Sequence, residues 1–186
     1  MLEQRIQQQF FDAADLKYRS ADSLTRPVAE ASQAIVGVLT AGGKLLVCGL
    51  GPAAPLASLF AARLMGRFER DRPGLAVIAL CADAAVLARQ VSTLGSPGDL
   101  LLLLAIDGEQ QDAASAAVEA AHAKDMAVIA LMGAGAGALH ASLGETDAAI
   151  AVPHERGARV LEMQLLILHC LCDAIDLQLL GEQDPA

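Results

Sequence analysis

The sequence has very few aromatic residues. Only 3% of its 186 residues are aromatic, with no Trp and a single Tyr, whereas 54% are hydrophobic. The core therefore has to be built from Ala, Leu, Val and Ile. Helices packed on a parallel sheet suit this composition better than a β-sandwich does, and the length is enough for one domain with a sizeable core.

Positive charge is also scarce. The chain has 13 Lys and Arg against 22 Asp and Glu, a formal net charge of −9. Direct nucleic-acid binding needs a basic face to neutralise phosphates, so it is not expected. Four arginines do cluster, but acidic residues interleave them, which predicts a solvated helix face. These arginines are Arg63, Arg67, Arg70 and Arg72.

Long apolar runs and cysteine motifs are missing. The longest apolar run, Leu100–Ile106, has the length of a strand, so no membrane association is expected. Residues 1–5 lack the apolar segment of a signal peptide, which favours a cytoplasmic protein. The cysteines show no metal-ligand spacing, and buried thiols without a metal are predicted. They are Cys48, Cys81, Cys170 and Cys172.

Strand-like and helix-like segments alternate from residue 44 onward. Five apolar runs are predicted as strands: 44–48, 75–80, 100–105, 127–131 and 148–152. Helices are predicted over 53–70, 84–94, 110–123 and 158–180. Because the strands are apolar throughout, both faces of their sheet are buried. We therefore expect an α/β fold, with a three-layer α/β/α arrangement around a parallel five-stranded sheet and a ligand crevice at the carboxyl ends of the strands.

Helices are predicted at both ends of the chain. Within 1–41 we expect two helices, the second capped by Thr25 with Pro27 in its first turn, ending at Gly42. The closing helix, 157–180, is apolar around most of its circumference. One sheet face cannot bury such a helix, so a subunit interface is expected to cover the rest.

Two loops are candidate ligand sites. Cys48–Ala54 has the form G-x-G-x-x-A between a strand and a helix, which suits an anion. A dinucleotide site would also need an acidic residue after the next strand, and Asp83 lies too far along. Pro52 removes one donor, so a simple tight turn explains the loop equally well. After the third strand, Asp107 and Glu109 suit helix capping and would repel a phosphate.

No recognisable reaction motif is present. The histidines are scattered, and His169 inside the apolar closing helix fits a hydrogen-bonded core or interface residue better than a ligand. The sequence contains no nucleophile elbow, phosphate loop or carboxylate pair. On these grounds alone it indicates no reaction.

Several stretches together resemble the sugar-isomerase (SIS) domain family, specifically the phosphoheptose isomerase group, which includes the DnaA initiator-associating proteins. They are residues 44–51, 66–73, 94–99, 126–133, 158–163 and 169–176. The resemblance implies a flavodoxin-like sheet and a homotetramer. It covers residues 1–186 as one domain, with N-terminal helices at 1–41, an α/β core at 44–152 and the closing helix.

The chain departs from this family at the implied active site. The isomerases read Asn-Gly-Gly-Ser in the first loop, where this chain has Leu50–Ala53. The family's hydroxyl-rich phosphate loop corresponds to residues 105–110, which carry no hydroxyl. The helix positions of a metal-binding His, a catalytic Glu and a Gln correspond to Leu59, Ala62 and Leu161, and only His169 matches. The family segment with an Asn-Asp pair is missing near 81–94.

The sequence therefore predicts a non-catalytic binding and assembly protein without cofactor or metal. Its degenerate cleft is expected at Gly49, Gly51, Ala53, Asp107, Gly108 and Glu162. The resemblance suggests the replication initiator as a protein partner, with Leu179 and Leu180 as candidate contacts, although these leucines fit the core or an oligomer interface equally well. The alternatives are an isomerase acting on sedoheptulose 7-phosphate and a sugar-phosphate-binding pseudo-subunit of an active paralogue.

Overall fold

The computed structural model describes residues 1–80 and 83–182, and its centre is a five-stranded sheet. The strands are β1 (Leu45–Gly49), β2 (Val77–Ala79), β3 (Leu100–Ala105), β4 (Ala127–Gly133) and β5 (Ala148–Val152). All neighbouring strands are parallel, in the order β2-β1-β3-β4-β5. The three-layer parallel architecture is therefore confirmed, although β2 is shorter than the predicted 75–80.

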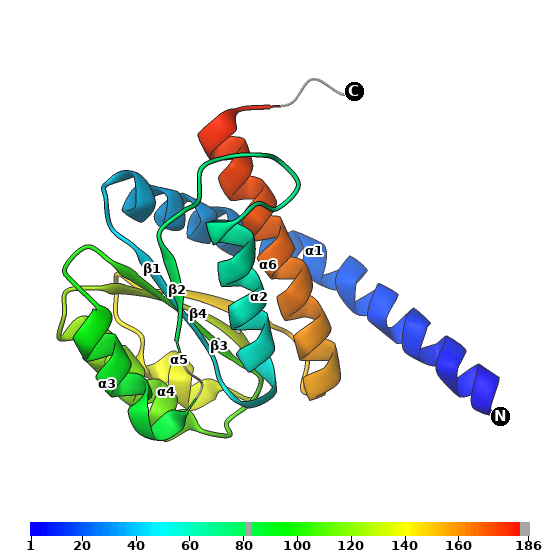
Figure 1. The fold of residues 1–186 in the computed structure, drawn as a ribbon. Helices are drawn as coiled ribbons and strands as arrows, with labels where there is room; N and C mark the ends of the chain where they lie inside the picture. The colour runs from blue at the N-terminus through cyan, green and yellow to red at the C-terminus, as the bar shows by residue number, and fades with distance from the viewer. Residues whose placement is uncertain (81–82, 183–186) are drawn as a thin grey trace.

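Helices cover both faces of the sheet. They are α1 (Leu2–Thr40), α2 (Ala54–Met65), α3 (Ala84–Leu94), α4 (Gln111–His122), α5 (Gly137–Ser142) and α6 (Gly157–Leu180). The helices α1, α2 and α6 lie on one face, and α3, α4 and α5 on the other (Figure 1). A separate apolar cluster fills each side. The helix α5 was not predicted, because glycines at 133, 135 and 137 resemble a loop.

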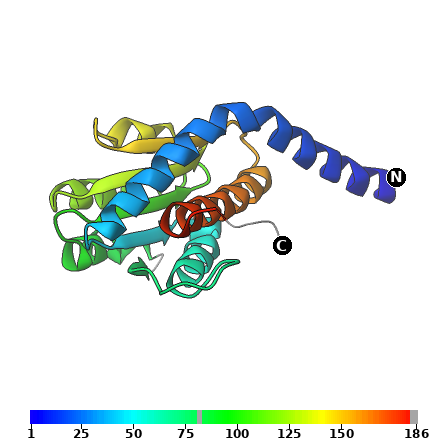
Figure 2. The same ribbon diagram turned by 90° about the horizontal axis from the view of Figure 1, so that it is seen from above.

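The N-terminal segment is one continuous helix, so the prediction of two helices was wrong. Pro27 lies inside α1, and the Thr25 hydroxyl donates to the carbonyl of Ala21 instead of capping a new helix. Proline removes one helical hydrogen bond and bends a helix without ending it when packing holds both sides. Figure 2 shows a bend along α1, with the N-terminal half of the helix extending away from the sheet.

The arginine cluster is not a solvated helix face throughout. The helix α2 ends at Met65 because Gly66 follows it, so Arg67, Arg70 and Arg72 lie in the connection to β2. Arg72 is buried, with 1% of its side chain exposed, and donates through Nε to Asp176 of α6. A buried guanidinium is tolerated because it is paired, so this residue ties the connection to the closing helix.

The prediction of buried thiols is confirmed in part. Cys48 and Cys172 are buried, and burial together with nearby Asp176 raises the pKa of Cys172 to about 12. Cys170, by contrast, is exposed on α6. Cys81 lies outside the described residues.

The closing helix α6 is less uniformly apolar than predicted, because its buried residues include Arg159, Gln164 and Asp176. In the part of the chain that the structure describes, no helix is both long and apolar enough to cross a membrane.

Candidate functional site

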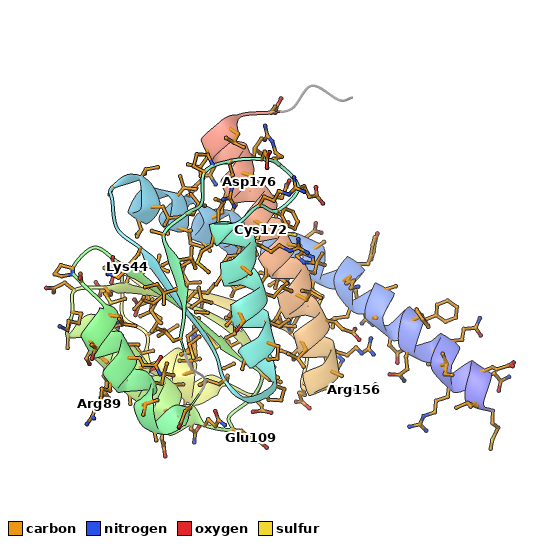
Figure 3. All side chains as sticks on the ribbon, viewed as in Figure 1. Lys44, Arg89, Glu109, Arg156, Cys172 and Asp176 are labelled. Atoms are coloured by element: carbon orange, nitrogen blue, oxygen red, sulfur yellow. The ribbon has the colours of Figure 1, made fainter. Side chains whose placement is uncertain are left out.

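The carboxyl ends of the strands meet at one edge of the sheet, as parallel pairing requires. The strands β1, β3, β4 and β5 end there at Gly49, Ala105, Gly133 and Val152. Figure 3 labels Glu109 and Arg156 along this edge, in the connections after β3 and β5. The predicted cleft residues of the first two loops therefore do come together at one end of the molecule.

The loop after β1 is a tight turn with few free donors. A Cβ on Gly49 would lie 2.2 Å from the carbonyl oxygen of Ala53, so only glycine allows the chain to turn this closely. The amides of Leu50 and Ala53 donate to Leu104 and Leu50, and Pro52 has no amide hydrogen. These bonds favour the tight-turn interpretation over an anion cradle.

The dinucleotide interpretation finds no support in the neighbouring strand. Asp83 accepts a hydrogen bond from the amide of Ala85 and caps α3. The side chain of Asp83 is therefore engaged in helix capping.

The loop after β3 is acidic, but neither Asp107 nor Glu109 caps α4, contrary to the prediction. Asp107 accepts from the amide of Glu109, 2.9 Å away, in a turn that precedes the helix. Gln110, the residue before α4, has φ of 61° and makes no side-chain cap. Two exposed carboxylates at this position repel a phosphate.

Gln164 of α6 organises this edge and was missed by the sequence analysis. It is fully buried, and its Nε2 donates to the carbonyl oxygens of Ala105 at 2.8 Å and Leu131 at 3.1 Å. It thereby links the ends of β3 and β4 to α6. The amide of Gln164 between apolar neighbours in the helix pattern was the only sequence signal of this role.

The four helix positions implied by the family resemblance lie on two neighbouring helices. Leu59 and Ala62 are exposed on α2, and Leu161 and His169 are half-buried on α6, which packs beside α2 (Figures 1 and 2). Within each pair the spacing places both residues on one helix face. The carbon side chains of the first three supply no metal ligand.

His169 packs against an aromatic ring. Its ring centroid lies 5.6 Å from that of Phe68, in the connection after α2. The predicted hydrogen-bonded role is not what the structure shows, since His169 has no hydrogen-bond partner among the described residues. Within those residues, too, no group of three His, Cys, Asp or Glu side chains is placed to hold a metal ion.

The remaining predicted residues lie along α6. Glu162 is half-buried and accepts from Arg159 through Oε2 at 2.6 Å, so it forms an ion pair on its own helix. At the other end of α6, Leu179 packs against the core, while Leu180 is 40% exposed. Of these two leucines, therefore, only Leu180 is exposed enough to contact a partner.

Sequence comparison with known proteins points to a single family. The SIS domain family profile matches residues 9–133. A phosphoheptose isomerase of Methylibium petroleiphilum is 55% identical over 99% of this chain and 98% of its own length. The DnaA initiator-associating protein DiaA of Yersinia pseudotuberculosis is 41% identical over 99% of this chain and 100% of its own length.

A solved structure agrees with these sequences. A phosphoheptose isomerase from Francisella tularensis superposes with a TM-score of 0.89 at 35% identity, covering 95% of this chain and 98% of its own. The shared fold extends past the profile match, through β5 and α6. From the profile, the relatives and the superposition together, the chain belongs to the SIS-domain family, among relatives named phosphoheptose isomerase and DnaA initiator-associating protein.

Proposed function

We propose that this protein is a non-catalytic SIS-domain protein that binds a partner as a homo-oligomer, a tetramer by resemblance, in the cytoplasm. The observation that carries the proposal is the set of side chains on α2 and α6. Leu59, Ala62 and Leu161 occupy the positions of a metal ligand, a catalytic carboxylate and an amide in the isomerases. Aldose–ketose isomerisation needs a base and an acid, and usually a polarising cation, and His169 alone does not supply this set.

A second candidate is an isomerase acting on sedoheptulose 7-phosphate. The names of the relatives favour it over the non-catalytic proposal, because most of those found at 39–55% identity are named phosphoheptose isomerase. A sugar-phosphate-binding pseudo-subunit that pairs with an active paralogue is an intermediate case. The side chains of the site thus favour a non-catalytic protein, whereas the names of the relatives favour an isomerase. An activity assay distinguishes these two functions.

The deciding experiment measures turnover of sedoheptulose 7-phosphate and the zinc content of the purified protein. We expect neither turnover nor stoichiometric zinc in the wild type. The variant Leu59→His, Ala62→Glu, Leu161→Gln restores the family residues around His169 and is expected to gain zinc. Zinc or turnover in the wild type would establish the isomerase candidate, and activity only in a mixture with a paralogue would establish the pseudo-subunit.

The initiator partner is proposed from the name of the Yersinia relative and from the end of α6. Leu180 is exposed where the chain leaves the core, and a tetramer repeats this contact, which raises avidity without new contacts. Leu180→Ser is expected to abolish retention of the initiator protein while leaving the oligomer intact. Leu94→Ser, at the end of α3 with 39% exposure, is the matched control. No retention by the wild type at low salt would disprove the partner.

A further inference from the structure

A small cavity of about 160 Å³ lies between the connection that follows α2 and the last turns of α6. It is lined by Phe68, Glu69 and Arg70 of the connection and by Asp173, Asp176 and Leu177 of α6. Figure 3 labels Asp176 near the C-terminal end of α6, where the connection passes. None of the four helix positions compared with the isomerases lines this cavity, so the inference does not rest on the proposed function.

Asp176 is a buried carboxylate that its neighbours satisfy only in part. The residue is 1% exposed. Its Oδ1 accepts from Arg72 Nε at 2.5 Å, whereas its Oδ2 has no hydrogen-bond partner within residues 1–80 and 83–182. The other nitrogens of Arg72 donate to the carbonyl oxygens of Leu64 at 2.7 Å and Arg63 at 3.2 Å, so the guanidinium leaves this oxygen unpaired. A buried acceptor without a donor carries an uncompensated desolvation cost, which a bound donor would remove.

Two further carboxylates line the cavity where it meets solvent. Glu69 and Asp173 are exposed, and neither makes a hydrogen bond or an ion pair within the described residues. Asp173 precedes Asp176 by three positions on α6, so the two side chains lie on one face of the helix. The cavity therefore carries one buried negative charge and two exposed ones.

Positive charge in the lining does not balance these three carboxylates. Arg72 pairs with Asp176, and Arg70 makes no ion pair within the described residues but donates through Nη1 to the carbonyl oxygen of Gly181 at 2.8 Å. The carbonyl end of α6 adds partial negative charge, and its last turn contains no basic residue. Three carboxylates and a helix C-terminus thus face two guanidinium groups, and this excess of negative charge favours a cation.

The walls and the size of the cavity limit which cation fits. Phe68 and Leu177 contribute an aromatic ring and an aliphatic side chain, and a cation over an aromatic ring gains further attraction. In the part of the chain that the structure describes, no three His, Cys, Asp or Glu side chains are placed to hold a metal ion. The cavity is also smaller than the roughly 300 Å³ at which pockets for drug-sized ligands begin. A short alkyl chain with an ammonium group suits such walls better than a metal ion does.

We propose that this cavity binds a small aliphatic diamine. One ammonium group donates to Asp176 Oδ2, and the methylene chain lies against Phe68 and Leu177. The second ammonium group pairs with Glu69 and Asp173 at the solvent side. Because an ammonium group carries three N–H donors, its contact with the buried carboxylate is a charge-assisted hydrogen bond. A cation without N–H groups leaves Oδ2 unpaired and is therefore disfavoured.

The test is calorimetric titration at low salt with 1,4-diaminobutane, tetramethylammonium and Mg²⁺. The wild type is expected to bind 1,4-diaminobutane with a Kd of about 1 mM or lower, and the other two cations at least about tenfold more weakly. Tetramethylammonium has no N–H donor, and Mg²⁺ keeps several of its waters. In an NMR titration with 1,4-diaminobutane, the carboxyl carbon of Asp176 is expected to shift, whereas that of Asp71, outside the cavity, is not.

The variants change the exposed carboxylates, because replacing Asp176 also breaks its pair with Arg72. Asp173→Asn is expected to weaken the binding of 1,4-diaminobutane about threefold, and Asp173→Asn with Glu69→Gln about tenfold, without lowering the melting temperature. Asp71→Asn is the matched control. It removes a negative charge from the same connection but outside the cavity, and is expected to change the affinity less than about twofold.

The proposal is overturned if the wild type binds no 1,4-diaminobutane at about 20 mM, a concentration that reveals even weak sites. It is also overturned if Asp71→Asn weakens binding as much as the double variant, since the diamine would then respond only to the overall negative charge. Tetramethylammonium or Mg²⁺ binding as tightly as the diamine would overturn the N–H contact. An unchanged NMR signal of Asp176 would likewise contradict it.

Discussion

A single buried charge, Asp99, holds the amino end of this sheet in place. At the amino end, Asp99 is 3% exposed and joins the starts of β1 and β3. Its Oδ1 accepts from the Lys44 amide at 2.8 Å, and its Oδ2 accepts from Lys44 Nζ and from the Ser96 amide. Burial alone would raise the pKa of Asp99, but these hydrogen bonds outweigh it and hold the pKa below its usual value.

Asp99 makes the stability depend on pH. Because its pKa is lower in the folded state, its contribution is complete above the unfolded pKa of about 3.9 and is lost as the pH falls through the folded value. Asp99→Asn is expected to destabilise the protein at pH 7, with a difference from wild type that shrinks below about pH 4. Urea unfolding across this range measures it. Asp71→Asn, at an exposed pair, is the control, and a pH-independent difference would contradict the assignment.

We expect a larger loss of stability when one charge of the buried Arg72–Asp176 pair is removed than when Asp99 is replaced. Both side chains are at most 2% exposed, so removing one charge leaves the other buried without its partner. Asp176→Asn is expected to lower the free energy of unfolding by about 3–5 kcal/mol. Asp173→Asn, exposed one turn earlier on α6, is expected to change it by less than about 0.5 kcal/mol. Equal effects in denaturant unfolding would rule out this role of the pair.

At the scale of secondary-structure elements, α6 connects most of the fold. It packs on α1, α2 and the sheet, and its polar residues make specific bonds within an apolar surface. Gln164 bonds to the ends of β3 and β4, although its Oε1 has no partner. The amide therefore contributes two hydrogen bonds at the cost of one unpaired acceptor.

Replacing this amide tests the link between α6 and the sheet. Gln164→Met keeps most of the volume but removes both donors, and we expect a loss of about 1 kcal/mol in the free energy of unfolding. The loss stays modest because the unpaired Oε1 is removed as well. Gln178→Met, at an exposed site on the same helix, is the control and is expected to cost less. A stabilised Gln164→Met protein would show that the unpaired acceptor dominates.

At the scale of the whole molecule, α1 and α6 leave apolar surface uncovered. Ile6, Phe10, Phe11 and Tyr18 are exposed on α1. A mostly apolar cavity of about 360 Å³, lined by residues such as Leu24, Val28 and Leu166, lies between α1 and α6. Apolar surface of this kind marks an interaction site.

We therefore expect a homo-oligomer in solution, built around α1 and α6. Light scattering is expected to give a mass several times the 19.2 kDa of one chain at micromolar concentration. The double variant Phe10→Ser, Phe11→Ser is expected to dissociate it, because the interface loses two exposed aromatic side chains. A stable wild-type monomer would refute this arrangement, and Arg5→Ser at the same end of α1 serves as the control.

The sequence by itself determined the layers of the fold. Five apolar segments separated by helical ones are enough to specify a parallel sheet buried on both faces, because that pattern depends only on local periodicity and short connections. For the same reason β3, β5 and α3 were predicted with their observed bounds. The proposed departures from the isomerase residues on α2 and α6 also come from the sequence alone.

Only the tertiary structure decided which residues that are distant in the chain meet in the fold. The continuity of α1 through Pro27 depends on packing that a local signal does not contain, and so does the burial of Arg72 against Asp176, 104 residues away. The two bonds of Gln164 and the apolar cavity between α1 and α6 likewise join residues far apart in the chain. Pairing between distant polar groups is set by how the elements meet in space, because each group is satisfied only by the partner that the fold brings to it.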